Sequence, residues 1–332
     1  MTDSAFAGAR VLITGGLGFI GSSLAVRLVE LGARVTLCDA LLPDAGANWF
    51  NIRSIEDQIR VNVNDVCDRY AMNWLVAGQD YIFHLAGQVS HVLGLTDPFP
   101  DVEHNIRGTL VLLEAVRRVN PRAVIVATGT RGQYGPVAEL PATEDMPADP
   151  IGIYEATRLA AERLLLSYHR LHGIAAVPLR LSNVYGPRSQ MKRADFGVVN
   201  WFVRLLLDGQ RIPIYGDGLI QRDFVYIDDC VEALLACATA EAARGEVLNL
   251  GSGVPVSLRE LANLLVRANG GGRWELVPFS AARKAVEPGD FYADIRKIAR
   301  LTGWSPRVPL TDGLGRTLTY YREHRDEYWV RG

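Results

Sequence analysis

Cysteine is scarce in this sequence, and no pair of cysteines is close along the chain. Four occur among 332 residues, with no CxxC pair and no metal-ligand spacing: Cys38, Cys67, Cys230 and Cys237. Isolated cysteines of this kind are typical of small buried side chains in a reducing compartment. The sequence therefore predicts no metal site and a cytoplasmic location.

Long apolar runs and an excess of charge of either sign are missing as well. No uncharged apolar stretch reaches the roughly 18 residues that a membrane span needs, and the start, MTDSAFAGARVLITGG, does not resemble a secretory signal peptide. The formal net charge is −2, from 35 basic and 37 acidic residues. We expect neither a membrane nor a nucleic acid as partner, so any anion site must be local.

Short apolar runs alternate with helical patterns over the first half of the chain. The runs read RVLITGG, RVTLCDA, RVNVNDV, DYIFHLAG, AVIVATG and AAVPLRLSNVYG. Strands covered on both faces have this Val-, Ile- and Leu-rich composition, and helices between them indicate parallel pairing. We expect an α/β fold with a Rossmann-type, doubly wound parallel sheet and a smaller C-terminal substrate-binding lobe.

The pattern loosens after Gly186, where polar loops, helices and short strands follow one another. We expect a nucleotide-binding domain over residues 1–186, with residues 222–250 returning to it. The smaller lobe is expected over residues 187–332, interleaved with that domain.

A glycine-rich loop follows the first predicted strand and opens a helix. In TGGLGFIGSS, Gly15, Gly18 and Gly21 have GxxGxxG spacing, and Asp39 ends the next predicted strand. Such a loop lets the backbone approach a pyrophosphate, whose charge is met by free N–H groups at the helix start. A carboxylate at Asp39 can bind a ribose diol and repel a 2′-phosphate, which favours NAD over NADP. The alternative is a glycine turn without a ligand.

Further motifs follow the glycine loop in a fixed order. HLAGQVS, Tyr154, LRLSNVYGPR, IYGDGLIQRDFVYIDD, VLNLGSG and EPGDFYADIRKI together resemble the extended short-chain dehydrogenase/reductase family, in its NAD-dependent nucleotide-sugar epimerase/dehydratase branch. The resemblance covers nearly the whole chain. It implies tightly held NAD and a nucleoside-diphosphate sugar bound between the lobes. The cofactor contacts that it implies are Gly15, Gly18, Phe19, Ile20, Gly21, Asp39, Asp65, Val66, Leu85, Ala86, Gly87, Gln88, Asn105, Thr128, Tyr154 and Arg158.

Thr130 and Tyr154 match the family's pair of hydroxyls at the reacting sugar oxygen, so the resemblance makes Thr130, Tyr154 and Arg158 the catalytic group. A free phenol has a pKa of about 10, so Tyr154 needs a nearby positive charge to act as a base. The family has lysine four residues after the tyrosine, where this chain has Arg158, one helical turn away on the same face. A guanidinium supplies the charge but holds its proton. We expect Arg158 to keep the electrostatic role; the alternative is a solvent-facing arginine beside an inert tyrosine.

The resemblance also implies residues that bind the sugar and its diphosphate. Arg222 matches an arginine that pairs with the diphosphate, and Asn183 matches a side chain at the sugar phosphate. A second family arginine is absent, because AVEPGD places Glu287 and Pro288 there; Arg283 is the candidate replacement. The full expected set is Gln88, Thr130, Asn183, Val198, Trp201, Arg204, Tyr215, Arg222 and Arg283, with core packing as the alternative role of Trp201.

The reaction class is inferred by subtraction. Family 4,6-dehydratases have Asp-Glu directly after the threonine, where this chain has Arg131 and Gly132. Family decarboxylases also typically have a carboxylate in this segment. Without one, the simplest course is return of hydride to the opposite face of a transient ketone, which is epimerisation, most often at C4. A dehydratase, an oxidoreductase and an NAD-binding sensor without turnover remain alternatives. Arg131 either points away or contacts a substrate carboxylate, such as that of a uronic acid.

Two predicted helical segments carry more apolar residues than one sheet face needs. They read DVEHNIRGTLVLLEAVRRV and YEATRLAAERLLLSYHRL. In the family the corresponding helices pack into a four-helix dimer interface, so we expect a homodimer with two-fold symmetry.

Overall fold

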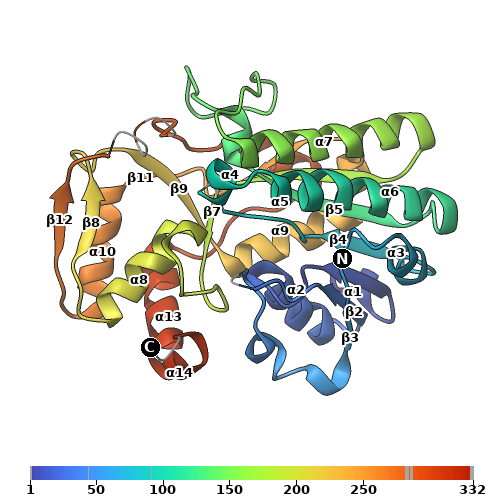
Figure 1. Ribbon diagram of the computed structural model, residues 1–332, viewed down its shortest axis with the longest axis horizontal. Coiled ribbons are helices and arrows are strands. Elements are labelled where there is room, and N and C mark those ends of the chain that lie inside the picture. The colour runs from blue at the N-terminus through green and yellow to red at the C-terminus, as the bar shows by residue number, and fades with distance from the viewer. Residues whose placement is uncertain (1, 44, 91, 281–283, 285–286, 330–332) are drawn as a thin grey trace.

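A parallel sheet of seven strands runs through the larger part of the computed structural model, in the order β10-β6-β5-β4-β1-β2-β3 (Figure 1). Its strands are β1 (Arg10–Thr14), β2 (Arg34–Asp39), β3 (Arg60–Val63), β4 (Tyr81–His84), β5 (Val124–Thr130), β6 (Ala176–Leu181) and β10 (Leu248–Leu250). The structure describes residues 2–43, 45–90, 92–280, 284 and 287–329. Each apolar run singled out in the sequence contributes a strand to this sheet, and the doubly wound α/β fold is confirmed.

Helices cover both faces of the large sheet. α3, α6 and α7 pack together on one face, whereas α2 and α9 pack together on the other (Figure 1). The helices are α1 (Thr2–Phe6), α2 (Phe19–Glu30), α3 (Arg69–Leu75), α4 (Leu93–Thr96), α5 (Phe99–Asp101), α6 (Gly108–Val119), α7 (Ile153–His172), α8 (Val198–Leu207), α9 (Ile227–Thr239), α10 (Leu258–Asn269), α12 (Arg296–Thr302), α13 (Leu310–Glu323) and α14 (Arg325–Tyr328). Among the helices of the described residues, none is both long and apolar enough to cross a bilayer.

Shorter helical turns link these elements. They are η1 (Trp49–Ile52), η2 (Glu56–Gln58), the π-helical η3 (Val102–Arg107), η4 (Arg131–Tyr134), η5 (Ala194–Phe196) and η6 (Glu241–Ala243). Three of them, η3, η4 and η5, lie beside the cavity described below.

The second lobe is built on two small sheets. One has the order β11-β9-β7 and the other pairs β12 with β8; the strands are β7 (Asn183–Tyr185), β8 (Ile212–Tyr215), β9 (Gln221–Tyr226), β11 (Pro255–Ser257) and β12 (Trp274–Val277). Residues 222–250 therefore split between the lobes. α9 packs on α2 and β10 pairs with β6, whereas β9 pairs with β7 and β11 in the small sheet.

A buried carboxylate ties the lobes together directly beside the cavity. Asp223 on β9 has no exposed surface and accepts hydrogen bonds from the backbone N–H groups of Ser252 and Gly253, at 2.6 and 3.1 Å. It also accepts from the Ala293 N–H at 3.1 Å and from the Ser182 hydroxyl at 3.2 Å. Since these partners come from three separate chain segments, Asp223 fixes the position of its neighbour Arg222.

Candidate functional site

A cavity of about 790 Å³ lies at the carboxyl ends of the large sheet's strands, against the second lobe. This edge is where open parallel sheets bind ligands. The expected residues that line it are Gly15, Gly18, Phe19, Ile20, Gly21, Asp39, Asp65, Val66, Leu85, Ala86, Gly87, Gln88, Thr128, Thr130, Tyr154, Arg158, Asn183, Val198 and Arg222. The fold thus brings together side chains that are up to two hundred residues apart.

Three of the residues expected in the nucleotide pocket do not line the cavity. Trp201 packs partly buried against the hydrophobic core, which is its alternative role. Arg204 turns to the C-terminal segment, where its guanidinium lies 4.5 Å from the Trp329 ring. The Tyr215 ring packs against the Phe279 ring, with 5.6 Å between the ring centres. Arg283 lies outside the described residues.

The glycine loop between β1 and α2 is shaped by close backbone contacts. Gly15 has φ +71°, and a Cβ there would lie 2.8 Å from the Ala86 nitrogen. A Cβ on Gly21 would overlap the Gly15 carbonyl oxygen. Asp39, at the end of β2, accepts a hydrogen bond from the Leu17 N–H at 3.0 Å, and burial raises the pKa of this carboxyl. Glycine is therefore required for the close packing of this loop.

Arg158 is buried at the floor of the cavity and does not face solvent. Its side chain is 6% exposed, and its two terminal nitrogens donate to the carbonyl oxygens of Thr128 at 3.3 Å and Gln88 at 3.2 Å. The guanidinium carbon lies 5.6 Å from the centre of the Tyr154 ring. The solvent-facing alternative for Arg158 is therefore excluded.

Burial and the charge of Arg158 have opposite effects on the pKa of Tyr154. Burial raises the pKa of the Tyr154 phenol, and the Arg158 guanidinium opposes that rise. Beneath them His84 is held between the hydroxyls of Thr14 and Thr109, at 2.9 and 3.0 Å. Burial, aided by Arg158, lowers the pKa of His84 to about 3. The histidine is therefore neutral, and the positive charge facing the phenol comes from the arginine.

Asn105 supports the cavity floor from behind, within the π-helical η3. Its amide donates to the Thr157 hydroxyl at 3.0 Å and to the Asp101 carboxylate at 3.3 Å. A Cβ on Gly87 would lie 2.5 Å from the Asn105 amide oxygen and 2.7 Å from an Arg158 nitrogen. A π-helical turn often marks a functional site, and here it brings Asn105 against the floor.

Two buried polar atoms at this floor lack a partner among the described residues. They are the Asn105 amide oxygen and the Arg158 Nε. Unpaired buried polar groups are costly, and they are common where a ligand completes the bonding. Together with the glycine loop and Asp39, they fit a dinucleotide, which the start of α2 and Arg158 would help to hold.

Thr130 holds the segment that follows β5. Its hydroxyl accepts from the Gly132 N–H at 3.2 Å, and its own N–H donates to the Gln133 side chain at 2.8 Å. Gln133 is fully buried and donates in turn to Glu162 at 2.7 Å. This chain of bonds fixes η4, so that Thr130 and Arg131 both line the cavity.

Sequence reasoning missed Glu155, which also lines the cavity. A Cβ on Gly132 would lie 2.6 Å from the Glu155 Cγ, and a Cβ on Gly152 would overlap its carboxylate. The two glycines therefore leave the space that Glu155 fills. An acid directly after Tyr154 was a usable signal, but in the first turn of a helix it usually indicates an interaction with the helix dipole.

Arg222 also lines the cavity and is 5% exposed. Its guanidinium bonds to the Glu287 carboxylate and donates to the Gly289 carbonyl oxygen at 2.6 Å. Asn183 donates to the backbone oxygen of Asp223 at 3.0 Å. Where the family resemblance led us to expect a second arginine, the chain thus has a carboxylate that pairs with the first one.

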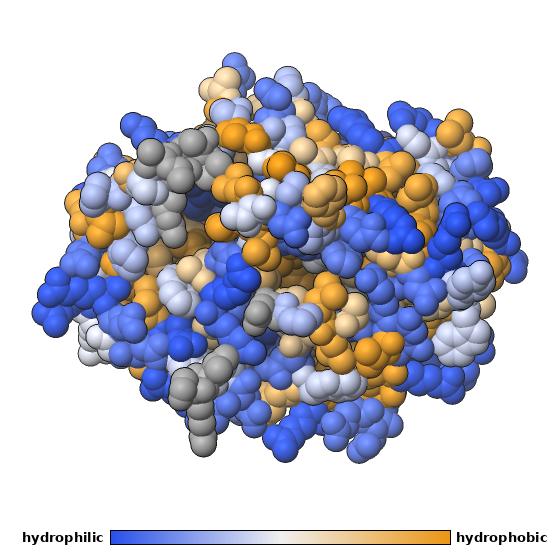
Figure 2. Space-filling view, in the orientation of Figure 1, coloured by the Kyte–Doolittle hydropathy of each residue, from blue (hydrophilic) through white to orange (hydrophobic). Residues whose placement is uncertain are grey.

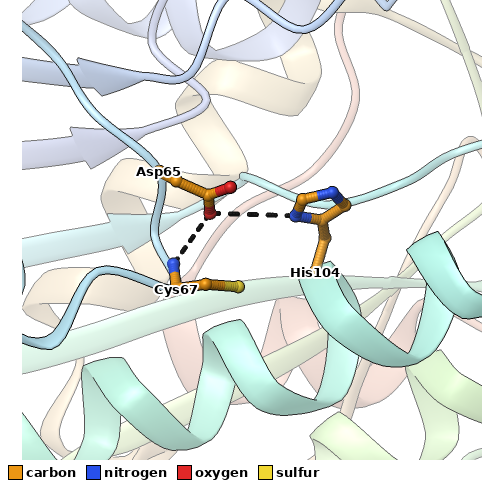
Figure 3. Close-up of side chains that lie close together, drawn as sticks. All are labelled: Asp65, Cys67 and His104. Atoms are coloured by element: carbon orange, nitrogen blue, oxygen red, sulfur yellow. Dashed lines mark hydrogen bonds and ion pairs between the residues drawn. The ribbon is translucent and has the colours of Figure 1, made fainter.

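Asp65, Cys67 and His104 lie together beside the cavity, and their possible ligand atoms are within 4.8 Å of one another (Figure 3). The Asp65 carboxylate accepts from the Cys67 N–H at 2.8 Å and lies 3.8 Å from His104 Nδ1. Burial and acidic neighbours raise the pKa of the Cys67 thiol to about 12, and a protonated thiol is a poor metal ligand. Linear spacing did not show this cluster, because His104 comes from η3.

Comparisons with known proteins agree with this geometry. Residues 11–251 match the model of the NAD dependent epimerase/dehydratase family. The chain is 35% identical over 327 residues to a dTDP-glucose 4,6-dehydratase of Streptomyces griseus, covering 96% of each chain. It is 33% identical over 317 residues to a UDP-glucose 4-epimerase of Mycolicibacterium smegmatis, covering 94% of this chain and 98% of that one. The solved structure of epimerase Mth375 from Methanothermobacter thermautotrophicus superposes with a TM-score of 0.91 at 28% identity, covering 98% and 95%.

Relatives of both reaction types, dehydratase and epimerase, thus cover almost the whole chain at similar identity. This similarity leaves the reaction itself open while agreeing on the cofactor and the substrate class. The chain belongs to the NAD-dependent epimerase/dehydratase family, whose members act on nucleoside-diphosphate sugars.

Proposed function

We propose that this protein is an NAD-dependent epimerase that inverts one hydroxyl-bearing carbon of a nucleoside-diphosphate sugar, C4 being the simplest choice. The observation that carries the proposal is that Thr130, Tyr154 and Arg158 line a single cavity, with the Arg158 guanidinium over the Tyr154 ring. Arg222 and Asn183 line the same cavity, and we assign the diphosphate to them.

NAD bound in this cavity would accept a hydride from the sugar carbon and return it to the opposite face. The ionised Tyr154 phenol would take the proton from the sugar hydroxyl, and Thr130 would donate a hydrogen bond to the same oxygen. Arg158 would stabilise the phenolate. After the transient ketose has turned in the site, Tyr154 would return the proton to the new hydroxyl.

A dehydratase is the second candidate, and Glu155 favours it. Its carboxylate lies beside Gly132, close to where family dehydratases carry a glutamate in the segment after the threonine. An acid at this place could remove a proton next to a ketone and so start the loss of water. Epimerisation remains the first proposal, because the position directly after Thr130 holds a cation, Arg131, in place of the second acid.

The test is incubation of the NAD-loaded protein with UDP-, GDP-, CDP- and dTDP-sugars, followed by proton NMR of the products. An epimer of one sugar supports the proposal, whereas a product that has lost one water establishes the dehydratase. Binding without conversion of any sugar would identify a sensor. Tyr154→Phe should lower the rate by about a hundredfold or more, while Tyr70→Phe on exposed α3 should leave it unchanged.

We further propose a homodimer built on the α6–α7 face. Figure 2 shows apolar side chains gathered over the helices α4 to α7. Phe99 is 76% exposed, and Val102, Leu110 and Ile153 are also exposed on these elements. Exposed apolar patches of this kind mark interaction surfaces, and self-association about a two-fold axis would cover this one.

A further inference from the structure

Arg131 is a half-buried arginine that lines the cavity without a polar partner. Within the described part of the chain its guanidinium makes no hydrogen bond and no ion pair; its contact is the face of the Phe291 ring, 5.5 Å from the guanidinium carbon. Arginine carries five N–H donors and a permanent positive charge. A cavity wall with such a group unpaired is suited to an anion.

The guanidinium is held in place by rigid neighbours. Phe291 is 2% exposed and packs against the buried ring of Tyr134 at 5.8 Å. At its backbone, Arg131 begins η4, which Thr130 caps and which buried Gln133 anchors. A planar donor that stacks on an aromatic ring is preorganised, so little conformational entropy is lost when a planar anion binds.

Four charged groups influence Arg131. Arg222 repels it, while Glu287, Glu155 and Asp223 attract it. Glu287 pairs with Arg222, and Asp223 accepts bonds from Ser252 and three other groups.

Glu155 lies beside Gly132, the residue that follows Arg131. Burial, together with Arg222, lowers the pKa of Arg131 to about 9. The guanidinium is still charged at neutral pH and makes no hydrogen bond or ion pair within the described residues, so its N–H donors are open to an incoming anion.

We propose that Arg131 binds a carboxylate on the sugar ring, so that the preferred substrates are nucleoside-diphosphate uronic acids. This inference rests on the proposed function and narrows its substrate class. Arg131 directly follows Thr130, whose hydroxyl faces the reacting sugar oxygen in that proposal, so Arg131 is the arginine that we assign to the sugar. Arg222, which lines the same cavity, is the one that we assign to the diphosphate. A carboxylate is planar and can accept two parallel hydrogen bonds from a guanidinium, which gives both affinity and orientation.

The test compares the binding of three probes to the NAD-loaded protein by calorimetry: UDP-glucuronic acid, UDP-glucose and UDP. We expect UDP-glucuronic acid to bind about tenfold or more tightly than UDP-glucose, the value of one hydrogen-bonded charge pair. Arg131→Met should remove this preference and leave the affinity for UDP unchanged. Arg131→Lys keeps the positive charge but loses the two parallel N–H donors of the guanidinium, so it should retain part of the preference. Arg300→Met, a matched change at an exposed site on α12, should retain all of it.

Three results would overturn the inference. Equal binding of the two sugars by the unchanged protein would show that no carboxylate is recognised. If Arg131→Met weakens the binding of all three probes equally, Arg131 contacts the diphosphate. If none of the three probes binds to the unchanged protein, the cavity is not a nucleotide-sugar site. The proposed function is tested separately by product NMR: a neutral sugar that is epimerised without a uronate preference refutes only the role of Arg131, and a uronate preference without conversion of any sugar refutes only the epimerase.

Discussion

Replacing Arg158 by methionine removes the guanidinium that faces Tyr154 while keeping a side chain of similar length. The guanidinium carbon lies 5.6 Å from the ring centre. With an effective dielectric constant of about 20, a charge pair at this separation interacts by about 3 kcal/mol, which corresponds to a factor of about a hundred in an equilibrium constant. Because Arg158 favours the phenolate, its removal should raise further the pKa of a phenol that burial already raises.

The direction of the effect on the rate follows from the role of Tyr154. A base acts in its ionised form, and below its pKa the ionised fraction falls tenfold for each unit by which the pKa rises. In Arg158→Met, kcat/KM at a fixed pH near 8 should therefore fall by about a hundredfold, and the limb that rises with pH should move to higher pH. Arg158→Lys should recover part of the loss, since lysine restores a positive charge with a different geometry.

The assay is kcat/KM for sugar conversion between about pH 6 and pH 10, with Arg300→Met as the matched control. Thermal unfolding of each variant separates a lost fold from a lost charge, because Arg158 also bonds to the carbonyl oxygens of Thr128 and Gln88. A folded Arg158→Met protein whose pH profile coincides with that of the unchanged enzyme would refute the electrostatic role.

Three further outcomes follow from the cofactor site, the core and the surface. Asp39→Asn keeps an oxygen for the Leu17 N–H but removes the charge, so the ratio of NADP to NAD affinity, measured by calorimetry, should rise about tenfold or more; an unchanged ratio would contradict the carboxylate's role. Arg180 and Glu162 form a buried ion pair at 2.8 Å. Arg180→Met leaves the Glu162 carboxylate buried without its cation, so it should lower the free energy of unfolding in urea by about 3–5 kcal/mol. A decrease below about 1 kcal/mol would show that the ion pair is dispensable. Leu110→Glu on exposed α6 should give a monomer in size-exclusion chromatography with light scattering, and a persisting dimer would place the interface elsewhere.

The parallel sheet could be predicted from the sequence because its signals are local. Runs such as RVLITGG and AVIVATG are apolar over several residues and bounded by turn residues, which indicates a doubly covered strand wherever the rest of the chain lies. The glycine loop was equally local, since Gly15 and Gly21 are needed for contacts within one turn and with the neighbouring strand end.

The direction of single side chains could not be predicted in the same way. Arg204 was expected in the nucleotide pocket from its place on α8, but its guanidinium lies over Trp329, more than a hundred residues further along the chain. Its direction depends on how α14 and its neighbours pack against α8, which spacing along one helix does not contain. Glu155 was missed for the opposite reason: helix-start preferences explained an acid there, while its contact with Gly132 exists only in the folded chain.

The entry of β10 into the large sheet also determines how this chain can be divided. Leu248–Leu250 completes the row of strands beyond β6, after the chain has already formed β7, α8, β8 and β9 of the second lobe. A fragment ending at residue 186 would leave the β6 backbone edge unpaired, and open strand edges invite aggregation. The second lobe therefore cannot be exchanged as one continuous segment; a chimera must leave β10 with its original partner β6.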